Sequence, residues 1–187
     1  MRRALFLALL LVPSLAAARP ITVGVGVGVT QSKVDGESGL DANQTLNLFG
    51  RLAFTERLSA QLEIQRIEVE DGSNVDIRTA TGLLVRDLGR GSLVPILMAG
   101  VGVAEADNGY TTTSALHLEL GAGLEYRASG GLTVGAELRV GTRSIEEDSY
   151  AYVNDGRPQP GSIALYAPSY LSEGEYRAAR LYVGIRF

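Results

Sequence analysis

The sequence lacks cysteine and tryptophan, and it contains a single lysine, Lys33, and a single histidine, His117. The absence of cysteine excludes a disulfide-stapled fold and any thiolate-ligated metal site. The formal net charge of −4 argues against nucleic acid as a partner, because binding a phosphate backbone requires a basic face. The sequence has no metal-ligand spacing and no G-x-G-x-x-G loop between a strand and a helix. It therefore predicts no bound metal and no cofactor.

The first 18 residues have the features of a targeting segment. Arg2 and Arg3 precede an apolar stretch of about 15 residues, which is short of the roughly 20 that a membrane-spanning helix needs. Small residues follow, ending in alanines at 16–18, as at a signal-peptide cleavage site. We expect a cleaved signal at 1–18 and one mature domain over 19–187; a retained membrane anchor is the alternative. No later run of 18 apolar residues predicts a transmembrane helix.

The rest of the chain alternates apolar and polar residues with a period of two, the period of a β-strand whose two faces differ. Eight segments show it: 21–30, 44–54, 58–65, 75–86, 93–104, 113–126, 132–143 and 179–187. Short connections at 55–57, 87–91 and 128–130 alternate with longer ones, of which 145–174 is the longest. This pattern predicts an all-β fold, an eight-stranded antiparallel up-and-down transmembrane β-barrel.

Two kinds of closed barrel could use these strands. A soluble, lipocalin-like barrel would turn the apolar faces inward around a ligand, whereas a membrane barrel would turn them toward lipid. Glycine-rich polar faces and an end within a strand at Phe187 favour the membrane barrel. We expect it in a bacterial outer membrane, in contact with lipid and lipopolysaccharide. With both termini in the periplasm, Phe54, Tyr126 and Phe187 would form an aromatic girdle at the periplasmic ends.

The first strand places valines on one face and Gly24, Gly26 and Gly28 on the other. In a membrane barrel the valines face lipid and the glycines face inward. The last strand must pair with the first, because an open edge in lipid leaves backbone groups without partners. We therefore expect large inward side chains of the last strand, such as Arg180 and Tyr182, to cover the glycines.

The signal, the eight alternating segments and the ending "LYVGIRF" resemble the small eight-stranded outer-membrane barrels, the OmpA-like and opacity-like family, over about residues 20–187. The resemblance implies that the ending is an assembly signal read by the barrel assembly machinery. Its members here are Leu181, Val183, Gly184, Ile185 and Phe187.

Charged residues on the predicted inward faces are the first functional candidates: Arg51, Glu63, Arg78, Arg86, Glu119, Glu125, Glu137, Arg139, Arg180 and Arg186. The interior of an eight-stranded barrel is about filled by side chains, and a buried charge needs a partner. These residues therefore form either a structural plug of ion pairs or the lining of a narrow polar path. Glu137 and Arg180 lie on neighbouring strands and are the pair we expect to meet.

His117 is predicted to face inward, where a hydrogen-bonded interior histidine is expected. Some eight-stranded outer-membrane barrels modify lipid A, and their deacylase type resembles a His-x-Ser arrangement, but the stretch here is His117-Leu118-Glu119. A nucleophile beside the histidine is thus missing, and the sequence predicts no enzyme.

The 145–174 connection is long for a compact domain, and long loops tend to be functional or disordered. Its tyrosines are typical of recognition surfaces: Tyr150, Tyr152, Tyr166 and Tyr170. It is either a surface-binding loop for an extracellular partner or a cap over the barrel mouth. We expect a structural and surface-interaction role for the protein, with a small low-conductance porin as the alternative. A lipid A-modifying enzyme and a soluble carrier rank below both.

Overall fold

The computed structural model describes residues 20–33, 40–68, 76–107, 112–145 and 174–187. The predicted signal at 1–18 and the four tyrosines of the long connection lie outside the described residues. No helix within the described ranges is long and apolar enough to cross a membrane.

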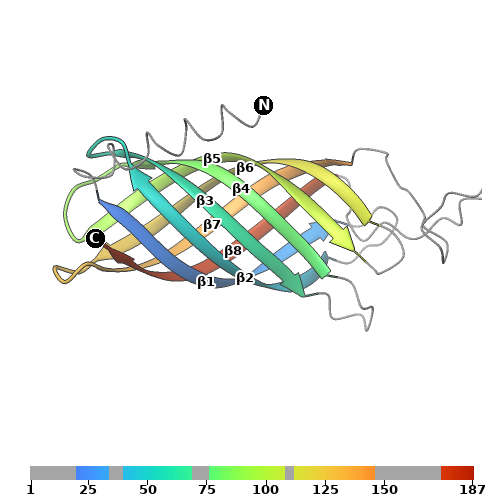
Figure 1. Ribbon diagram of the computed structural model, residues 1–187, viewed down its shortest axis with the longest axis horizontal. Helices are drawn as coiled ribbons and strands as arrows, with labels where there is room; N and C mark the ends of the chain where they lie inside the picture. The colour runs from blue at the N-terminus through green and yellow to red at the C-terminus, as the bar shows by residue number, and fades with distance from the viewer. Residues whose placement is uncertain (1–19, 34–39, 69–75, 108–111, 146–173) are drawn as a thin grey trace, which may run out of the picture.

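The described residues form one closed antiparallel barrel of eight strands in sequence order (Figure 1). The strands are β1 (Ile21–Lys33), β2 (Leu40–Ala53), β3 (Leu58–Glu68), β4 (Asp76–Asp87), β5 (Leu93–Asp107), β6 (Thr112–Arg127), β7 (Leu132–Ile145) and β8 (Gly174–Arg186). The predicted fold and all eight strands are confirmed, and several strands extend beyond the alternating segments that predicted them.

The two ends of the barrel differ. At one end, the turn end, short connections join β2 to β3, β4 to β5 and β6 to β7, and the C-terminus lies there too (Figure 1). The other, the loop end, is where the strands lead into 34–39, 69–75, 108–111 and 146–173. Gly91 and Gly131, in two of the turns, have φ angles of 115° and 85°, which side chains with a Cβ rarely adopt.

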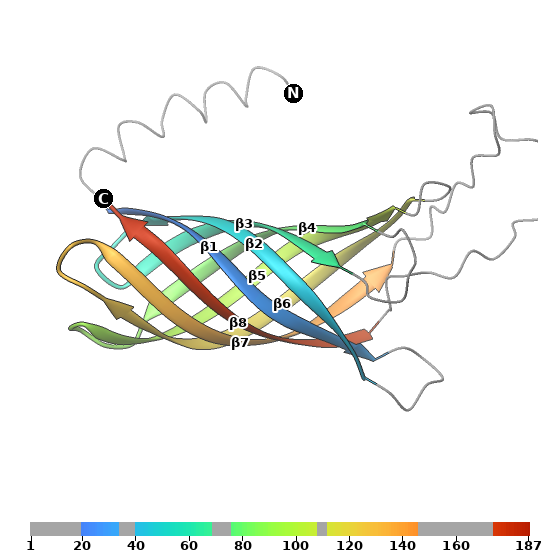
Figure 2. The same ribbon diagram turned by 90° about the horizontal axis from the view of Figure 1, so that it is seen from below.

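The barrel closes between its first and last strands, as predicted. Strand β8 pairs with β1 from Thr22↔Arg186 to Ser32↔Tyr176, and Figure 2 shows the two side by side. Strand β8 also pairs with β7, so neither of its edges is open. Closure satisfies the backbone groups that an open sheet would leave exposed to lipid.

The apolar faces of most strands point outward. Leu62, Ile64 and Leu138 are 73%, 64% and 68% exposed, and similar Leu, Val and Ile side chains surround the barrel. An apolar belt this extensive requires lipid and not water around it. The lipocalin-like alternative is therefore wrong. The predicted aromatic girdle is present at the turn end, where Phe54, Tyr126 and Phe187 are exposed.

Candidate functional site

Seven of the ten charged residues predicted to face inward are buried inside the barrel: Arg51, Glu63, Glu119, Glu125, Glu137, Arg139 and Arg180. Arg186 is exposed and lines the mouth of the barrel at the turn end. For Arg78 and Arg86 the prediction is wrong, because both lie on the outward face of β4 and are exposed.

The error on β4 has a physical cause. The strand has apolar residues of both parities, and its bulkier set, Ile77, Leu83 and Val85, faces inward. There it joins two apolar interior clusters that β5 shares, one of them made of Leu83, Val85, Val94, Ile96 and Met98. The outward middle of β4 consists of Ala80, Gly82 and Leu84, so the lipid belt stays apolar. The two arginines lie toward the strand ends, where long side chains can reach the membrane interface.

Arg139 on β7 is the centre of the interior. Its guanidinium lies 2.8 Å from Glu63 Oε2, 2.7 Å from Glu119 Oε1 and 2.5 Å from Glu137 Oε1. These carboxylates come from β3, β6 and β7, so one side chain ties three strands together. Tyr176 Oη donates to the second oxygen of Glu119 at 2.9 Å.

Arg180 completes this central cluster from β8. Its guanidinium binds Glu63 and donates to Gln65. The predicted partner, Glu137, faces Arg180 directly in the strand register, but its Oε1 lies 3.8 Å from Nη1. The expected pairing is confirmed, although the main partner of Arg180 is Glu63 on the far side of the barrel.

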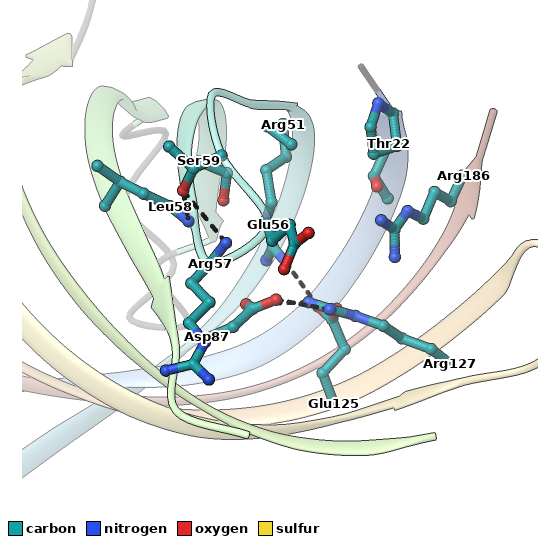
Figure 3. A pocket seen from close by; sticks show the side chains of 13 residues that line it. Thr22, Arg51, Glu56, Arg57, Leu58, Ser59, Asp87, Glu125, Arg127 and Arg186 are labelled. Carbon is teal, nitrogen blue, oxygen red and sulfur yellow. Dashed lines mark hydrogen bonds and ion pairs between the residues drawn. The ribbon is translucent and has the colours of Figure 1, made fainter. Parts of the chain in front are cut away.

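A second cluster lies nearer the turn end (Figure 3). Arg51 Nη1 is 2.6 Å from Glu125 Oε2, which also accepts a hydrogen bond from Tyr182 Oη at 2.7 Å. Arg127 lies 2.6 Å from both Asp87 and Glu125. Gln61 links the two clusters, because it accepts from Arg51 Nε and donates to Glu63.

Two of the ion pairs cross the full width of the barrel. In an eight-stranded ring β2 lies opposite β6 and β3 lies opposite β7, so Arg51–Glu125 and Arg139–Glu63 each join opposite walls. Together with their neighbours they form what we call the charged plug. It comprises Arg51, Glu63, Asp87, Glu119, Glu125, Arg127, Glu137, Arg139, Arg143 and Arg180. Five arginines and five carboxylates make the charged plug formally neutral, as burial requires.

Sequence reasoning missed several members of this network. Asp87 and Arg127 lie at strand ends; we assigned Asp87 to a connection, and Arg127 fell between the predicted segment 113–126 and the turn at 128–130. Arg143 has the same inward parity as Glu137 and Arg139, and it stacks 4.5 Å from the centroid of the Tyr176 ring. Arg143 lies within the predicted segment 132–143 and was passed over, whereas extending the 113–126 segment by one residue would have found Arg127. Asp87 could not be found in this way, because its parity on β4 had been assigned to the lipid face.

The lone histidine is interior, as predicted. His117 is 3% exposed, its Nε2 lies 3.0 Å from Thr81 Oγ1, and its ring meets Tyr176 edge to face. Within the described ranges no group of three or more histidine or acidic side chains is placed to hold a metal ion.

The glycines of β1 are covered from two sides. A Cβ on Gly26 would lie 3.1 Å from Tyr182 Cβ, and a Cβ on Gly28 would lie 2.8 Å from Arg180 Cγ. The expected cover of these two glycines by β8 is confirmed. A Cβ on Gly24 would instead lie 2.5 Å from Cζ of Phe49, a residue of β2. The ring of Phe49 packs edge to face on the ring of Tyr182. These contacts fill the interior space over the glycines of β1. The pocket at the turn end has a volume of about 30 Å³, which is room for about two or three water molecules.

Comparison with known proteins agrees with this architecture. The sequence profile described as "Outer membrane protein beta-barrel domain" matches residues 4–159. No curated protein sequence matches the chain. Among solved structures, Neisserial surface protein A is similar with a TM-score of 0.67 at 9% identity, over 89% of this chain and 97% of that one. The N-terminal barrel of Pseudomonas aeruginosa OprF gives 0.54 at 14% identity, over 89% and 97% of the two chains. The attachment invasion locus protein of Yersinia pestis gives 0.52 at 17%, over 90% and 99%. At these identities the likeness shows the fold alone.

Proposed function

The chain belongs to the outer membrane protein β-barrel domain family, and from that premise we propose that it is a non-conducting barrel with a structural and surface-interaction role. It would stabilise the bacterial outer membrane and hold its loop-end connections at the cell surface. The observation that carries this proposal is the pair of ion pairs joining opposite walls at two levels, Arg51–Glu125 and Arg139–Glu63. Side chains that touch across the full diameter at two levels obstruct a continuous water column.

Single-channel conductance of the refolded protein in a planar bilayer tests this proposal. We expect no discrete steps from protein whose barrel content is verified by circular dichroism. Replacing Glu63 and Arg139 together by alanine removes the central contact and should produce steps. The matched control replaces Glu56 and Arg90, an exposed ion pair in the turns, and should stay silent. Reproducible steps from the unmodified protein would overturn the proposal and favour the small low-conductance porin.

The proposed role is not enzymatic. The position of His117 inside the barrel supports this, because its Nε2 lies beside Thr81 Oγ1 and its ring contacts the ring of Tyr176. A histidine held by a threonine hydroxyl inside a filled barrel has no path to a lipid substrate on the outer wall.

The proposal includes an orientation, with the turn end in the periplasm and the loop end outside. Short turns and longer loops are divided in this way in outer-membrane barrels. Because the chain has no cysteine, a single introduced cysteine reports its own location. In intact cells a membrane-impermeant maleimide should label Asn108→Cys, between β5 and β6, and leave Arg90→Cys unlabelled. Labelling of Arg90→Cys alone would reverse the orientation.

Export and assembly complete the proposal. Cleavage after residue 18 would give a mature protein beginning at Arg19, which intact mass measurement tests directly. The barrel assembly machinery would then read Leu181, Val183, Ile185 and Phe187, which line the outward face of β8. In the closed barrel both edges of β8 are paired, so this recognition has to precede closure. The 145–174 connection with its tyrosines remains the proposed site for an extracellular partner.

A further inference from the structure

Two arginines face each other on the outer wall of the barrel. Arg66 of β3 and Arg78 of β4 are directly opposite in the strand register, and both side chains are exposed. Each lies two residues from the strand end that leads into the loop end. We call them the arginine pair. Like charges directly opposite each other on a sheet are destabilising unless something else at the site compensates them.

The position of the pair across the membrane follows from β4. Arg78 and Arg86 face outward eight residues apart, which is about 26 Å along the strand and about 20 Å along the barrel axis at a tilt near 40°. The apolar band of an outer-membrane barrel is about 25 Å tall. The two arginines therefore mark opposite boundaries of the apolar belt, with Ala80, Gly82 and Leu84 between them. The arginine pair lies at the headgroup boundary of the loop-end leaflet.

The exposed side chains at the level of the arginine pair have a net positive charge. Glu105 of β5 is exposed and opposite Arg78, so the three side chains carry a net charge of +1. Two positions farther toward the loop end, the register pairs two acidic residues, Glu68 with Asp76. Both arginines also interact within the protein. A bound anion would thus add to existing contacts and would be confined to the level of the arginine pair.

We propose that the arginine pair is a binding site for the phosphate groups of a phosphorylated outer-leaflet glycolipid of the lipid A type. A guanidinium can donate two parallel hydrogen bonds to a phosphate, and two facing guanidiniums suit a multiply charged headgroup. The acyl chains would lie along the apolar belt beneath, beside Ile64, Ala80 and Val103. The site lies outside the charged plug, so the inference rests on the membrane location and on the proposed orientation, and it is independent of whether the barrel conducts.

Lipid retention measured by native mass spectrometry tests the proposal. The refolded barrel in neutral detergent is titrated with bisphosphorylated lipid A, with its dephosphorylated form and with phosphatidylglycerol. We expect bisphosphorylated lipid A to bind best. Replacing both arginines by glutamine should weaken it about tenfold or more, because two charge-assisted contacts are lost. Arg66→Lys with Arg78→Lys keeps the charge but not the paired geometry and should weaken binding less.

Arg86→Gln is the matched control, since Arg86 is an outward arginine of the same strand at the opposite boundary. It should leave lipid A binding unchanged. Circular dichroism and heat-dependent gel mobility verify that each variant is folded. The proposal is overturned if the double glutamine variant binds as the parent does, if Arg86→Gln loses as much, or if phosphatidylglycerol binds equally well. Detergent has no sidedness, so failure here is distinct from an error in the proposed orientation.

Discussion

Replacing Arg139 by leucine should strongly destabilise the barrel. Arg139 is 1% exposed and is the shared partner of Glu63, Glu119 and Glu137. Leucine would leave three buried carboxylates with Arg180 as the remaining close cation of the central cluster. Removing one member of a buried ion pair costs about 3–5 kcal/mol, because the other charge stays buried without compensation. We expect a loss of unfolding free energy in that range.

Urea unfolding in phospholipid vesicles measures this loss. The chain has no tryptophan, so far-UV circular dichroism and heat-dependent gel mobility are the appropriate signals. Arg90→Leu is the control, because Arg90 pairs with Glu56 at 3.2 Å in full exposure to solvent. Exposed pairs contribute about 0–1 kcal/mol. A loss for Arg139→Leu no larger than for Arg90→Leu would refute the reasoning that the charged plug stabilises the barrel.

A second variant separates charge from packing. Glu119→Gln in the Arg139→Leu background removes one uncompensated carboxylate while keeping its shape. The double variant should be destabilised by less than the sum of the two single changes, with a coupling of about 0.5–3 kcal/mol. Strict additivity would mean that leucine acts only through lost packing.

Two further changes test the packing over the glycines of β1 and the proposed C-terminal assembly signal. Gly24→Ala should lower the free energy of unfolding by about 1–3 kcal/mol in the same urea assay, because the new Cβ would lie 2.5 Å from the Phe49 ring and from the carbonyl oxygen of Val183. Gly50→Ala is the control and should be close to neutral, because its Cβ would meet nothing within 4 Å. Equal effects of the two would contradict tight packing over β1. Deleting Phe187 should reduce barrel assembled in cells several-fold while leaving refolding in vesicles intact, as cell fractionation and gel mobility would show. Normal assembly without Phe187 would rule out its part in the signal.

The charged plug also gives the fold its specificity. The interior has an apolar side, formed mainly by β4 and β5, and a charged side drawn mainly from β2, β3, β6, β7 and β8. Each arginine of the central cluster meets carboxylates from more than one strand, and a shift of one residue in any register would turn these groups toward lipid. The arrangement therefore favours a single pairing of strands over alternatives that would bury the same apolar area.

The failure on β4 shows where periodicity stops being informative. Alternation predicts that a strand has two faces, but it identifies the lipid face only when one parity is clearly more apolar. In the middle of β4 both parities are apolar. Which one faces inward depended on packing against apolar side chains of β5 and against Ile67 inside the barrel. Arg78 and Arg86 were assigned inward on the rule that charges avoid lipid, but that rule weakens near the membrane boundaries.

The sequence by itself determined the eight strands, their order, the closed barrel and the lipid-facing side of most strands. Each of these depends on a period of two and on short turns, which are local properties of the chain. It also identified most of the buried charges. Only the tertiary structure decided which charges meet, because Arg51 and Glu125 are 74 residues apart and come together only when β2 and β6 face each other across the closed barrel. Closure sets the diameter and the stagger of the strands, and these fix the partners of every interior side chain.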